Sequence, residues 1–347
     1  MMHQSAVSPE VLSRLLHSSG ALPAGTVTAI DIDREVETPV SRLAFVTATY
    51  SSDSPPGLPH QLVVKSPIVS SILPDAGARE LEFYRRLAPT IGSPPLARCL
   101  ATVDAGNGAP ETLVLQDLRA THDHPAWPLP PSRVQSERAV ETLAHVHAEW
   151  WEAYSLGRTF GSLHSTESLT EMVQGIATHL PAFLDARGDA ITADSRQILE
   201  TVFSSSLKPW MRLVEFRALT VTHGDAHSWN FLFPRSGEGP AVLIDWQLWH
   251  IDVGARDLAF MMALHWYPGR RRELEVPLLR LYHEVLLGRG VKGYSFDDLM
   301  LDYRLSVVRN LTFPIVLWSR GMNPEAWFHR LECALAAYRD LDCAELL

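Results

Sequence analysis

The part of the chain that most constrains its fold is a pair of short apolar stretches, residues 221–233 and 241–247, joined by a polar turn. The turn holds two glycines and two prolines, which predicts a hairpin between two β-strands. Asp225 lies five residues before Asn230, and Asp245 follows Asn230 by fifteen. The hairpin would bring Asn230 and Asp245 beside one another, so three oxygen-bearing side chains are expected to converge.

This set of side chains meets the needs of phosphoryl transfer. An acid must orient the acceptor hydroxyl and take its proton, while hard oxygen ligands hold Mg²⁺ against the phosphates of a nucleotide. The spacing from Asp225 to Asn230 is that of a kinase catalytic loop, and Asp245 stands where kinases place a further metal ligand. We interpret Asp225 as the catalytic base and Asn230 and Asp245 as the ligands of Mg²⁺.

Two departures separate these motifs from protein kinases. His-Gly-Asp at 223–225 replaces His-Arg-Asp, and Asp-Trp-Gln at 245–247 replaces Asp-Phe-Gly. In this form, and together with the segments 143–151 and 252–259, they resemble the small-molecule kinases of the aminoglycoside phosphotransferase, choline kinase and ecdysteroid-kinase-like (CHK kinase-like) group. The resemblance covers residues 26–265. It implies an α+β, bilobal protein-kinase-like fold, with an antiparallel β-sheet in the N-terminal lobe and a mostly helical C-terminal lobe.

The resemblance also assigns nucleotide-binding residues upstream. Lys65 ends an apolar strand, where a lysine is costly unless it has an anionic partner. It would orient the phosphates and pair with Glu80, on a helix expected over residues 79–87. Gln116 and Leu118, where the chain crosses between the lobes, would bind the adenine edge through main-chain atoms. A solvated surface lysine is the plain alternative for Lys65.

The loop that would cover the phosphates departs from the kinase pattern. Residues 37–42, between strands expected at 26–32 and 44–50, contain no glycine. A backbone cradle for phosphates is therefore not predicted, and Ser41 with its amide is the expected contact instead. This departure leaves open the alternative of a nucleotide-binding pseudokinase. The presence of Lys65 and of the three side chains of the central stretch, Asp225, Asn230 and Asp245, favours an active enzyme.

The histidines of the central stretch allow another interpretation. His223, Asp225 and His227 alternate along an extended segment and would suit the metal site of a metallohydrolase. No second cluster with ligand spacing occurs elsewhere in the sequence. We expect His223 instead to brace the loop from the core. Asp257 is interpreted as a buried acid that fixes the same loop through hydrogen bonds.

The acceptor site is expected in the C-terminal helices. A capping box at 295–298 opens a helix predicted to reach residue 318, with a bend near Pro314. Its polar residues are either substrate contacts or an exposed amphipathic face: Asp297, Asp298, Asp302, Arg309 and Asn310. Members of the resembled group use aminoglycosides, macrolides, amino alcohols, sugars or steroid-like alcohols as acceptors.

The composition of the chain limits the kinds of molecule that it is expected to bind. The chain has 347 residues and a formal charge of −10, which does not favour a nucleic-acid or anionic membrane surface. Three cysteines without metal or redox spacing fit the reducing cytoplasm. No secretory signal and no apolar run long enough to span a membrane is predicted. No feature of the sequence indicates an oligomeric state.

The sequence thus predicts an N-terminal nucleotide-binding lobe over residues 1–117 and a C-terminal catalytic and substrate-binding lobe over residues 118–347. The expected activity is transfer of the γ-phosphoryl group of ATP, or of GTP, to a hydroxyl of a small-molecule acceptor. Mg²⁺ is the expected cofactor.

Overall fold

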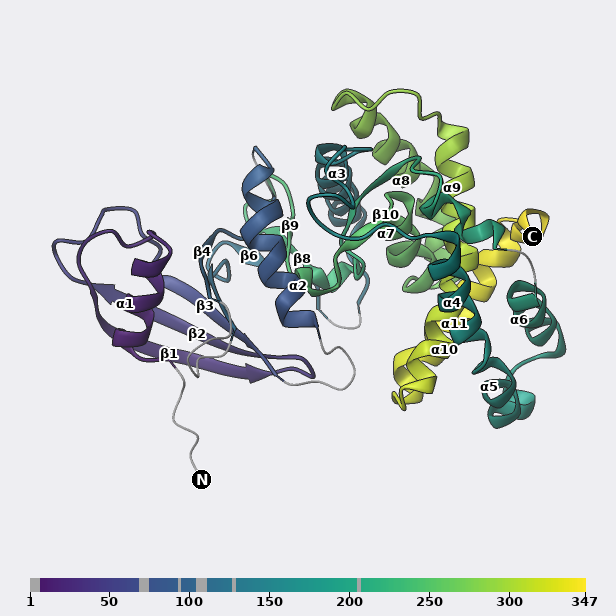
Figure 1. Cartoon of the computed structure of the whole chain (residues 1–347), viewed down its shortest axis with the longest axis horizontal. Helices are drawn as coiled ribbons and strands as arrows, with labels where there is room; N and C mark the ends of the chain where they lie inside the picture. Colours follow the sequence, from purple (N-terminus) through teal and green to yellow (C-terminus); the bar gives the residue numbers. More distant parts are fainter. Residues whose placement is uncertain (1–6, 69–74, 93–94, 104–110, 127–128, 205–206) are drawn as a thin grey trace. The chain divides into compact units, whose positions relative to one another are not determined.

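The computed structural model describes residues 7–68, 75–92, 95–103, 111–126, 129–204 and 207–347. The chain forms two compact units (Figure 1). Unit 1 comprises Met1–His124 and Leu232–Leu248, and unit 2 comprises Pro125–Phe231 and Trp249–Leu347. Residues 1–6, for which no secretory signal is predicted, lie outside the described residues. Within the described ranges, no helix has both the length and the apolar character that a membrane crossing requires.

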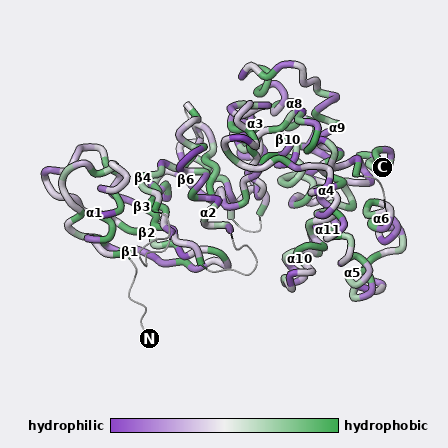
Figure 2. The backbone as a smooth tube through the Cα atoms, in the orientation of Figure 1, coloured by the Kyte–Doolittle hydropathy of each residue, from purple (hydrophilic) through white to green (hydrophobic). Residues whose placement is uncertain are grey.

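Unit 1 is built on a five-stranded antiparallel sheet in the order β1-β2-β3-β5-β4. The strands are β1 (Val27–Glu37), β2 (Ser41–Tyr50), β3 (Gln61–Pro67), β4 (Cys99–Val103) and β5 (Thr112–Gln116). Helix α1 (Pro9–Ser18) lies beside this sheet (Figure 1) and buries Leu12 and Leu16 in a core shared with the strands. Hydrophobic and hydrophilic residues interleave along α1 and the strands (Figure 2), as expected where each element buries one face.

The remaining elements of unit 1 position the predicted site. Helix α2 (Ala76–Glu82) continues as a π-helical turn over Phe83–Leu87, which confirms the helix expected over 79–87. A three-stranded sheet has the order β6-β8-β9, with β6 (His122–Asp123), β8 (Phe231–Pro234) and β9 (Val242–Leu243). Strands β8 and β9 are neighbours, so the hairpin predicted around the polar turn is confirmed.

Unit 2 is mostly helical. Its helices are α3 (Arg133–Glu149), α4 (Thr166–Ala177), α5 (Leu180–Arg187), α6 (Ala193–Ser204), α7 (Ala255–Ala259), α8 (Pro268–Gly288), α9 (Phe296–Asn310), α10 (Thr312–Ser319) and α11 (Pro324–Asp340). Two short antiparallel strands, β7 (Leu219–Thr222) and β10 (His250–Val253), flank the catalytic stretch in sequence. The antiparallel sheet of unit 1 and the helices of unit 2 confirm the predicted α+β class.

Local sequence explains where several of these helices begin and end. A capping box formed by Ser295 with Asp298 opens α9 as predicted, and another formed by Ser132 with Gln135 opens α3. The predicted bend near Pro314 is a break, because α9 ends at Asn310 and α10 starts at Thr312. Asn310 lies four residues before Pro314, where the proline ring clashes with a helical carbonyl and no N–H is available to bond it.

The two units do not follow the predicted lobe boundary after Asp117, because they are defined by internal contacts and group Leu232–Leu248 with the N-terminal part of the chain. That boundary stays a prediction about lobes. For the site, it matters that Lys65, Glu80 and Asp245 belong to unit 1, whereas Asp225 and Asn230 belong to unit 2.

Candidate active site

In unit 1, three of the predicted residues form one ionic cluster. Lys65 Nζ lies 2.6 Å from Glu80 Oε2 and 2.5 Å from Asp245 Oδ1. Lys65 reaches this position because β3 runs between β2 and β5, with Leu43 and Leu113 opposite the lysine. The lysine and the glutamate are buried, while the Asp245 side chain keeps 31% of its surface exposed. The predicted pairing of Lys65 with Glu80 is confirmed, and the solvated-lysine alternative is wrong.

The charges of this cluster support one another. Burial opposes the charge of Lys65, but the carboxylates of Asp245 and Glu80 outweigh it and raise the pKa of the lysine above its ordinary value. Burial also raises the pKa of Glu80, and Lys65 opposes that rise. Glu80 Oε1 is buried without a hydrogen-bond partner among the described residues. Lys65 is therefore held as a cation at a fixed point, as binding of phosphates requires.

The turn that carries Asp245 is strained and anchored. Asp245 has a φ of +69°, in the left-handed region that residues other than glycine seldom adopt. Its Oδ2 accepts a hydrogen bond of 3.2 Å from Gln247 Nε2. The next residue, Trp246, is fully buried and stacks on Phe83, with ring centroids 3.8 Å apart and planes inclined by 5°. The stack ties this turn to the helical segment that carries Glu80.

We expect Trp246→Ala to lower the free energy of unfolding by about 3–5 kcal/mol, because it removes a fully buried indole and its stacking contact with Phe83. Trp246→Phe retains an aromatic ring against Phe83 and should lose much less. Thermal unfolding of the two variants and the wild type measures the difference. An unfolding temperature of Trp246→Ala equal to that of the wild type would show that the stack does not stabilise the turn.

In unit 2, the catalytic stretch holds Asp225 and Asn230 together. Asn230 Nδ2 donates to the main-chain carbonyl of Asp225 at 2.8 Å and to Asp225 Oδ2 at 3.3 Å. His227 Nε2 lies 3.6 Å from the same carboxylate. Because the amide nitrogen of Asn230 is occupied, its amide oxygen is the atom left to bind a cation. The five-residue spacing thus folds into a compact turn around one carboxylate.

The Asp257 carboxylate holds the start of the segment that carries Asp225. Asp257 is completely buried, and its carboxylate accepts hydrogen bonds from the backbone N–H groups of His223 at 2.6 Å and Gly224 at 3.0 Å. His147 Nε2 lies 3.2 Å from the same carboxylate, and Tyr282 contacts the other ring nitrogen. Burial raises the pKa of Asp257, but the hydrogen bonds and charges of His147 and His223 bring it below its ordinary value. The structural role predicted for Asp257 is confirmed.

The other residues predicted to bind the nucleotide are Ser41, Gln116 and Leu118, and their main-chain groups differ in whether they are already hydrogen-bonded. The N–H of Ser41 donates to Thr38 Oγ1 at 2.9 Å, so this amide is engaged within its own turn, and no contact between described residues joins Ser41 to the Lys65 cluster. Gln116 ends β5, and its N–H donates to the carbonyl of Arg98. The carbonyl of Leu118 accepts from Thr121 and His122, whereas its N–H has no acceptor among the described residues.

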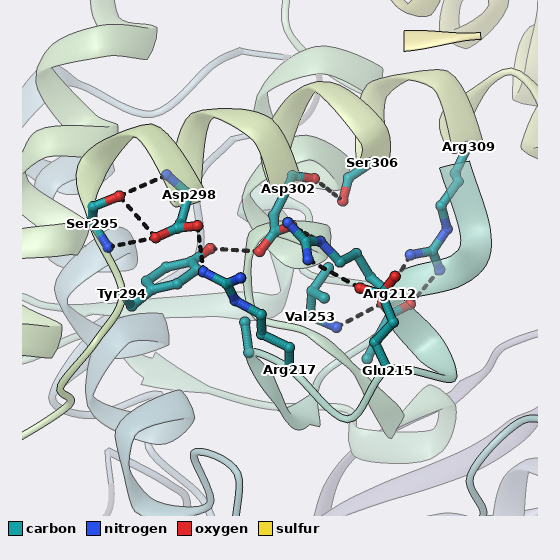
Figure 3. Close-up of polar contacts among 12 residues, drawn as sticks. Arg212, Glu215, Arg217, Val253, Tyr294, Ser295, Asp298, Asp302, Ser306 and Arg309 are labelled. Atoms are coloured by element: carbon teal, nitrogen blue, oxygen red, sulfur yellow. Dashed lines mark hydrogen bonds and ion pairs between the residues drawn. The ribbon is translucent and has the colours of Figure 1, made fainter. Parts of the chain in front are cut away.

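Two acidic residues of α9, Asp298 and Asp302, form ion pairs inside unit 2, whereas Asp297 is exposed. Figure 3 shows Asp298 and Asp302 directed toward Arg217 and Arg212, respectively. Asp302 is buried, and burial raises its pKa to about 6 while Arg212 opposes that rise. Arg309, also drawn in Figure 3, pairs with Asp252.

Asn310 completes this set of internal contacts. It is buried and donates to the carbonyl of Ala259 at 2.9 Å. The exposed-face interpretation is therefore wrong for Asp302, Arg309 and Asn310, because their helix is enclosed by other parts of unit 2. Their polar atoms serve internal contacts and are not offered to a substrate.

Nothing in the described ranges supports the metallohydrolase. No group of three or more His, Cys, Asp or Glu side chains there is placed to hold a metal ion. His223 is fully buried, and its Nδ1 accepts a hydrogen bond of 3.3 Å from the N–H of Asp225. The ring therefore braces the loop, as expected for a core histidine.

Sequence reasoning assigned no role to two residues of the unit 1 cluster. Gln247 orients Asp245, and Phe83 receives Trp246. Gln247 has a signal, since it is the third residue of the motif that begins at Asp245. Phe83 has only a weak one, as a large apolar residue one turn after Glu80.

Comparison with known proteins identifies the family. The sequence profile of the "phosphotransferase enzyme family" matches residues 56–294, more than half of the chain. No curated protein matches. Among solved structures, a provisional aminoglycoside phosphotransferase from Ralstonia eutropha JMP134 is similar, with a TM-score of 0.60, 15% identity and coverage of 97% of this chain and 98% of that one.

Two further structures have the same fold. Choline kinase from Cryptosporidium parvum Iowa II has a TM-score of 0.56 at 14% identity, covering 91% of this chain and 89% of that one. The GDP complex of aminoglycoside 2'-phosphotransferase-IIIa has a TM-score of 0.51 at 12% identity, covering 97% and 99%. At these identities the likeness shows the fold, and the family match carries the assignment. The chain belongs to the phosphotransferase enzyme family and is a kinase of the small-molecule type on a protein-kinase-like fold.

Proposed function

We propose that the protein transfers the γ-phosphoryl group of ATP to a hydroxyl of a small molecule, with GTP as an alternative donor. The observation that carries this proposal is the Lys65–Glu80–Asp245 cluster of unit 1, in a chain whose unit 2 holds Asp225 in a kinase-type loop. The GDP complex of a structurally similar phosphotransferase is the reason to keep GTP.

Asp225 is the proposed base. Its carboxylate accepts the proton of the acceptor hydroxyl while the hydroxyl oxygen forms a bond to the γ-phosphorus. The bond from that phosphorus to the bridging oxygen breaks, and the nucleoside diphosphate leaves with the bond's electron pair. Asn230, hydrogen-bonded to Asp225 at its carbonyl and carboxylate, keeps the base in place. Alignment and charge neutralisation supply most of the acceleration in reactions of this kind.

Asn230 and Asp245 are the proposed ligands of Mg²⁺. An amide oxygen and a carboxylate are hard oxygen donors of the kind this ion prefers, and the exposed part of Asp245 gives it access. When bound, Mg²⁺ would neutralise charge on the nucleotide phosphates. Lys65, held by Glu80, is proposed to bind the same phosphates and orient them.

Main-chain atoms at residues 116–118 are the proposed adenine contacts. The N–H of Leu118, which no described residue accepts, supports a hydrogen bond to the base, and Gln116 would contribute its carbonyl. The role of Ser41 stays a prediction. A reducing compartment such as the cytoplasm suits the three free cysteines.

The direct test is a transfer experiment with γ-labelled ATP and GTP in the presence of Mg²⁺. Purified protein is incubated with a panel of hydroxyl compounds, including amino alcohols, sugars, aminoglycosides and hydroxy acids. We expect label on an alcohol oxygen of at least one compound, together with equimolar nucleoside diphosphate. Binding of nucleotide without transfer to any compound would favour the pseudokinase.

A further inference from the structure

Arg330, close to the loop that carries Asp225, has no carboxylate partner among the described residues. Arg330, on α11, donates from Nε to His265 Nε2 at 3.0 Å and from a terminal nitrogen to the carbonyl of Ala326. Its guanidinium lies 6.0 Å from the centre of the Phe313 ring. No ion pair joins Arg330 to an Asp or Glu of the described ranges, and its other terminal nitrogen has no protein acceptor there. The Arg330 side chain is half-buried, so this nitrogen is left open to solvent or to a ligand.

Three other arginines of unit 2 have protein acceptors for their guanidinium groups. Arg271 pairs with Glu275 and Asp340, and Arg309 pairs with Asp252. Arg256 lacks a carboxylate but donates to the carbonyl of Ser306 and to Asn310. Arg330 differs from them, because one of its terminal nitrogens has no acceptor among the described residues and is available to an anionic group from outside the chain.

Arg330 belongs to the surroundings of the catalytic base. His227 lies 3.6 Å from the Asp225 carboxylate, and the rings of His227 and His265 are 5.5 Å apart. His265 Nδ1 donates to the carbonyl of Phe260, which leaves Nε2 as the acceptor for Arg330. Burial lowers the pKa of Arg330 and the charge of Asp225 opposes this, consistent with their proximity. A group bound at Arg330 would therefore lie close to Asp225.

We propose that Arg330 binds an oxyanion, a carboxylate or a phosphate, carried by the acceptor, and thereby makes hydroxylated acids the substrate class. The inference rests on the proposed function, since it assumes that Asp225 receives the acceptor hydroxyl. A guanidinium presents paired N–H donors that match both oxyanions and is always charged. His265, in its neutral form, holds the guanidinium in place by accepting from Nε.

The same oxyanion chemistry has a second source, the γ-phosphate of the nucleotide. The two sources differ in one measurable respect. If Arg330 binds the acceptor, removing it leaves the affinity for Mg·ATP unchanged in the absence of acceptor. If Arg330 binds the nucleotide, the same change weakens Mg·ATP itself.

The test is a thermal-shift titration of the full chain with two matched sets of hydroxyl compounds, all in the presence of Mg²⁺ and a non-hydrolysable ATP analogue. Glycerate and glycerol 3-phosphate carry an oxyanion, whereas glycerol is neutral and choline is cationic. The variants are Arg330→Gln, Arg330→Lys and, as a matched control, Arg320→Gln on the exposed end of α10. Mg·ATP alone is titrated against each protein in parallel.

We expect an oxyanion compound to stabilise the wild type and Arg320→Gln, with glycerol and choline giving no shift. Arg330→Gln should weaken that binding on the order of 30-fold or more, and Arg330→Lys should fall between. Mg·ATP should bind all variants equally. The oxyanion compounds could raise the unfolding temperature through Arg330 while Mg·ATP gives no rise. In that case the anion site would stand and the proposed kinase function would be wrong.

Three results would overturn the proposal while leaving the kinase function in place. They are stabilisation by choline and not by either oxyanion compound, an unchanged oxyanion affinity in Arg330→Gln, and weakened Mg·ATP binding in Arg330→Gln without acceptor. Absence of a shift with both oxyanion compounds, when Mg·ATP binds, would count equally against it.

Discussion

Asp225→Asn is expected to lower the rate of phosphoryl transfer by about 10²–10⁴-fold, the range typical for removal of a general base. The amide has nearly the same shape as the carboxylate, and its oxygen can still accept the hydrogen bond from Asn230. It cannot take up the proton of the acceptor hydroxyl. The turnover number, measured with an acceptor found in the transfer screen, should fall while affinity for Mg·ATP changes little.

Asp185→Asn is the matched control, because Asp185 is exposed on α5 and belongs to no predicted site. It removes one carboxylate from the same unit and should leave the turnover number at the wild-type value. If Asp225→Asn turned over at the wild-type rate, another group would be the base. If it abolished Mg·ATP binding, Asp225 would serve the nucleotide rather than the acceptor.

Asp257→Ala is expected to destabilise unit 2 by about 3–5 kcal/mol, the magnitude for removing one partner of a buried charged network. The backbone N–H groups of His223 and Gly224 and the ring of His147 would lose their common acceptor in a fully buried place. Because the same bonds hold the loop that carries Asp225, transfer should also fall. Thermal unfolding and turnover are the two measurements.

The pH dependence gives a second check on Asp257. A carboxyl whose pKa is lowered in the folded state stabilises the fold fully above its unfolded value, and this contribution is lost as the pH falls through the folded value. The ordinary pKa of an aspartate side chain, which holds in the unfolded chain, is 3.8. The difference in stability between wild type and Asp257→Asn should therefore be constant above about pH 5 and shrink below it.

Asp194→Ala provides the control for the loss of a carboxylate. Asp194 pairs with Arg339 on the surface, with 71% of its side chain exposed. Such pairs contribute little, so stability should be nearly unchanged. If Asp257→Ala were as stable as Asp194→Ala, the buried carboxylate would not be what holds the catalytic loop.

The contacts of the site that could be predicted from the sequence join residues that lie close together along the chain. Asp225 and Asn230 are five residues apart, and one turn brings their side chains together whatever the rest of the chain does. A lysine that ends an apolar strand needs an anionic partner, and the resemblance to a known family indicated that Glu80 on the next helix is this partner. The resemblance to a known family supplied the rest.

Contacts between distant segments could not be predicted. Phe83 and Trp246 stack across a long sequence separation, and no local pattern indicates that the two rings are in register. Asp302 reads as one more polar residue of an amphipathic helix, yet Arg212 and Tyr294 meet it in the interior. Which polar face a helix buries depends on what packs against it, and the helix's own sequence does not contain that information.

The charge near Asp225 is another feature that the sequence alone did not predict. A net charge of −10 suggests a field that welcomes cations. Close to Asp225, however, lies Arg330, a cation that forms no ion pair with a carboxylate of the described residues. Net charge averages over all solvated faces of the chain, whereas recognition depends on the few groups beside the reacting atoms.

The central claim, a Mg·nucleotide site that uses Lys65, Glu80 and Asp245, is tested most directly by the unfolding temperature with ATP and GTP, with and without Mg²⁺. Wild type is compared with Asp245→Asn and with Asp123→Asn, whose exposed carboxylate pairs with Arg235. We predict a Mg-dependent rise of several degrees in the wild type and Asp123→Asn that Asp245→Asn loses. The absence of any Mg-dependent rise with either nucleotide, or an equal rise in Asp245→Asn, would contradict the account.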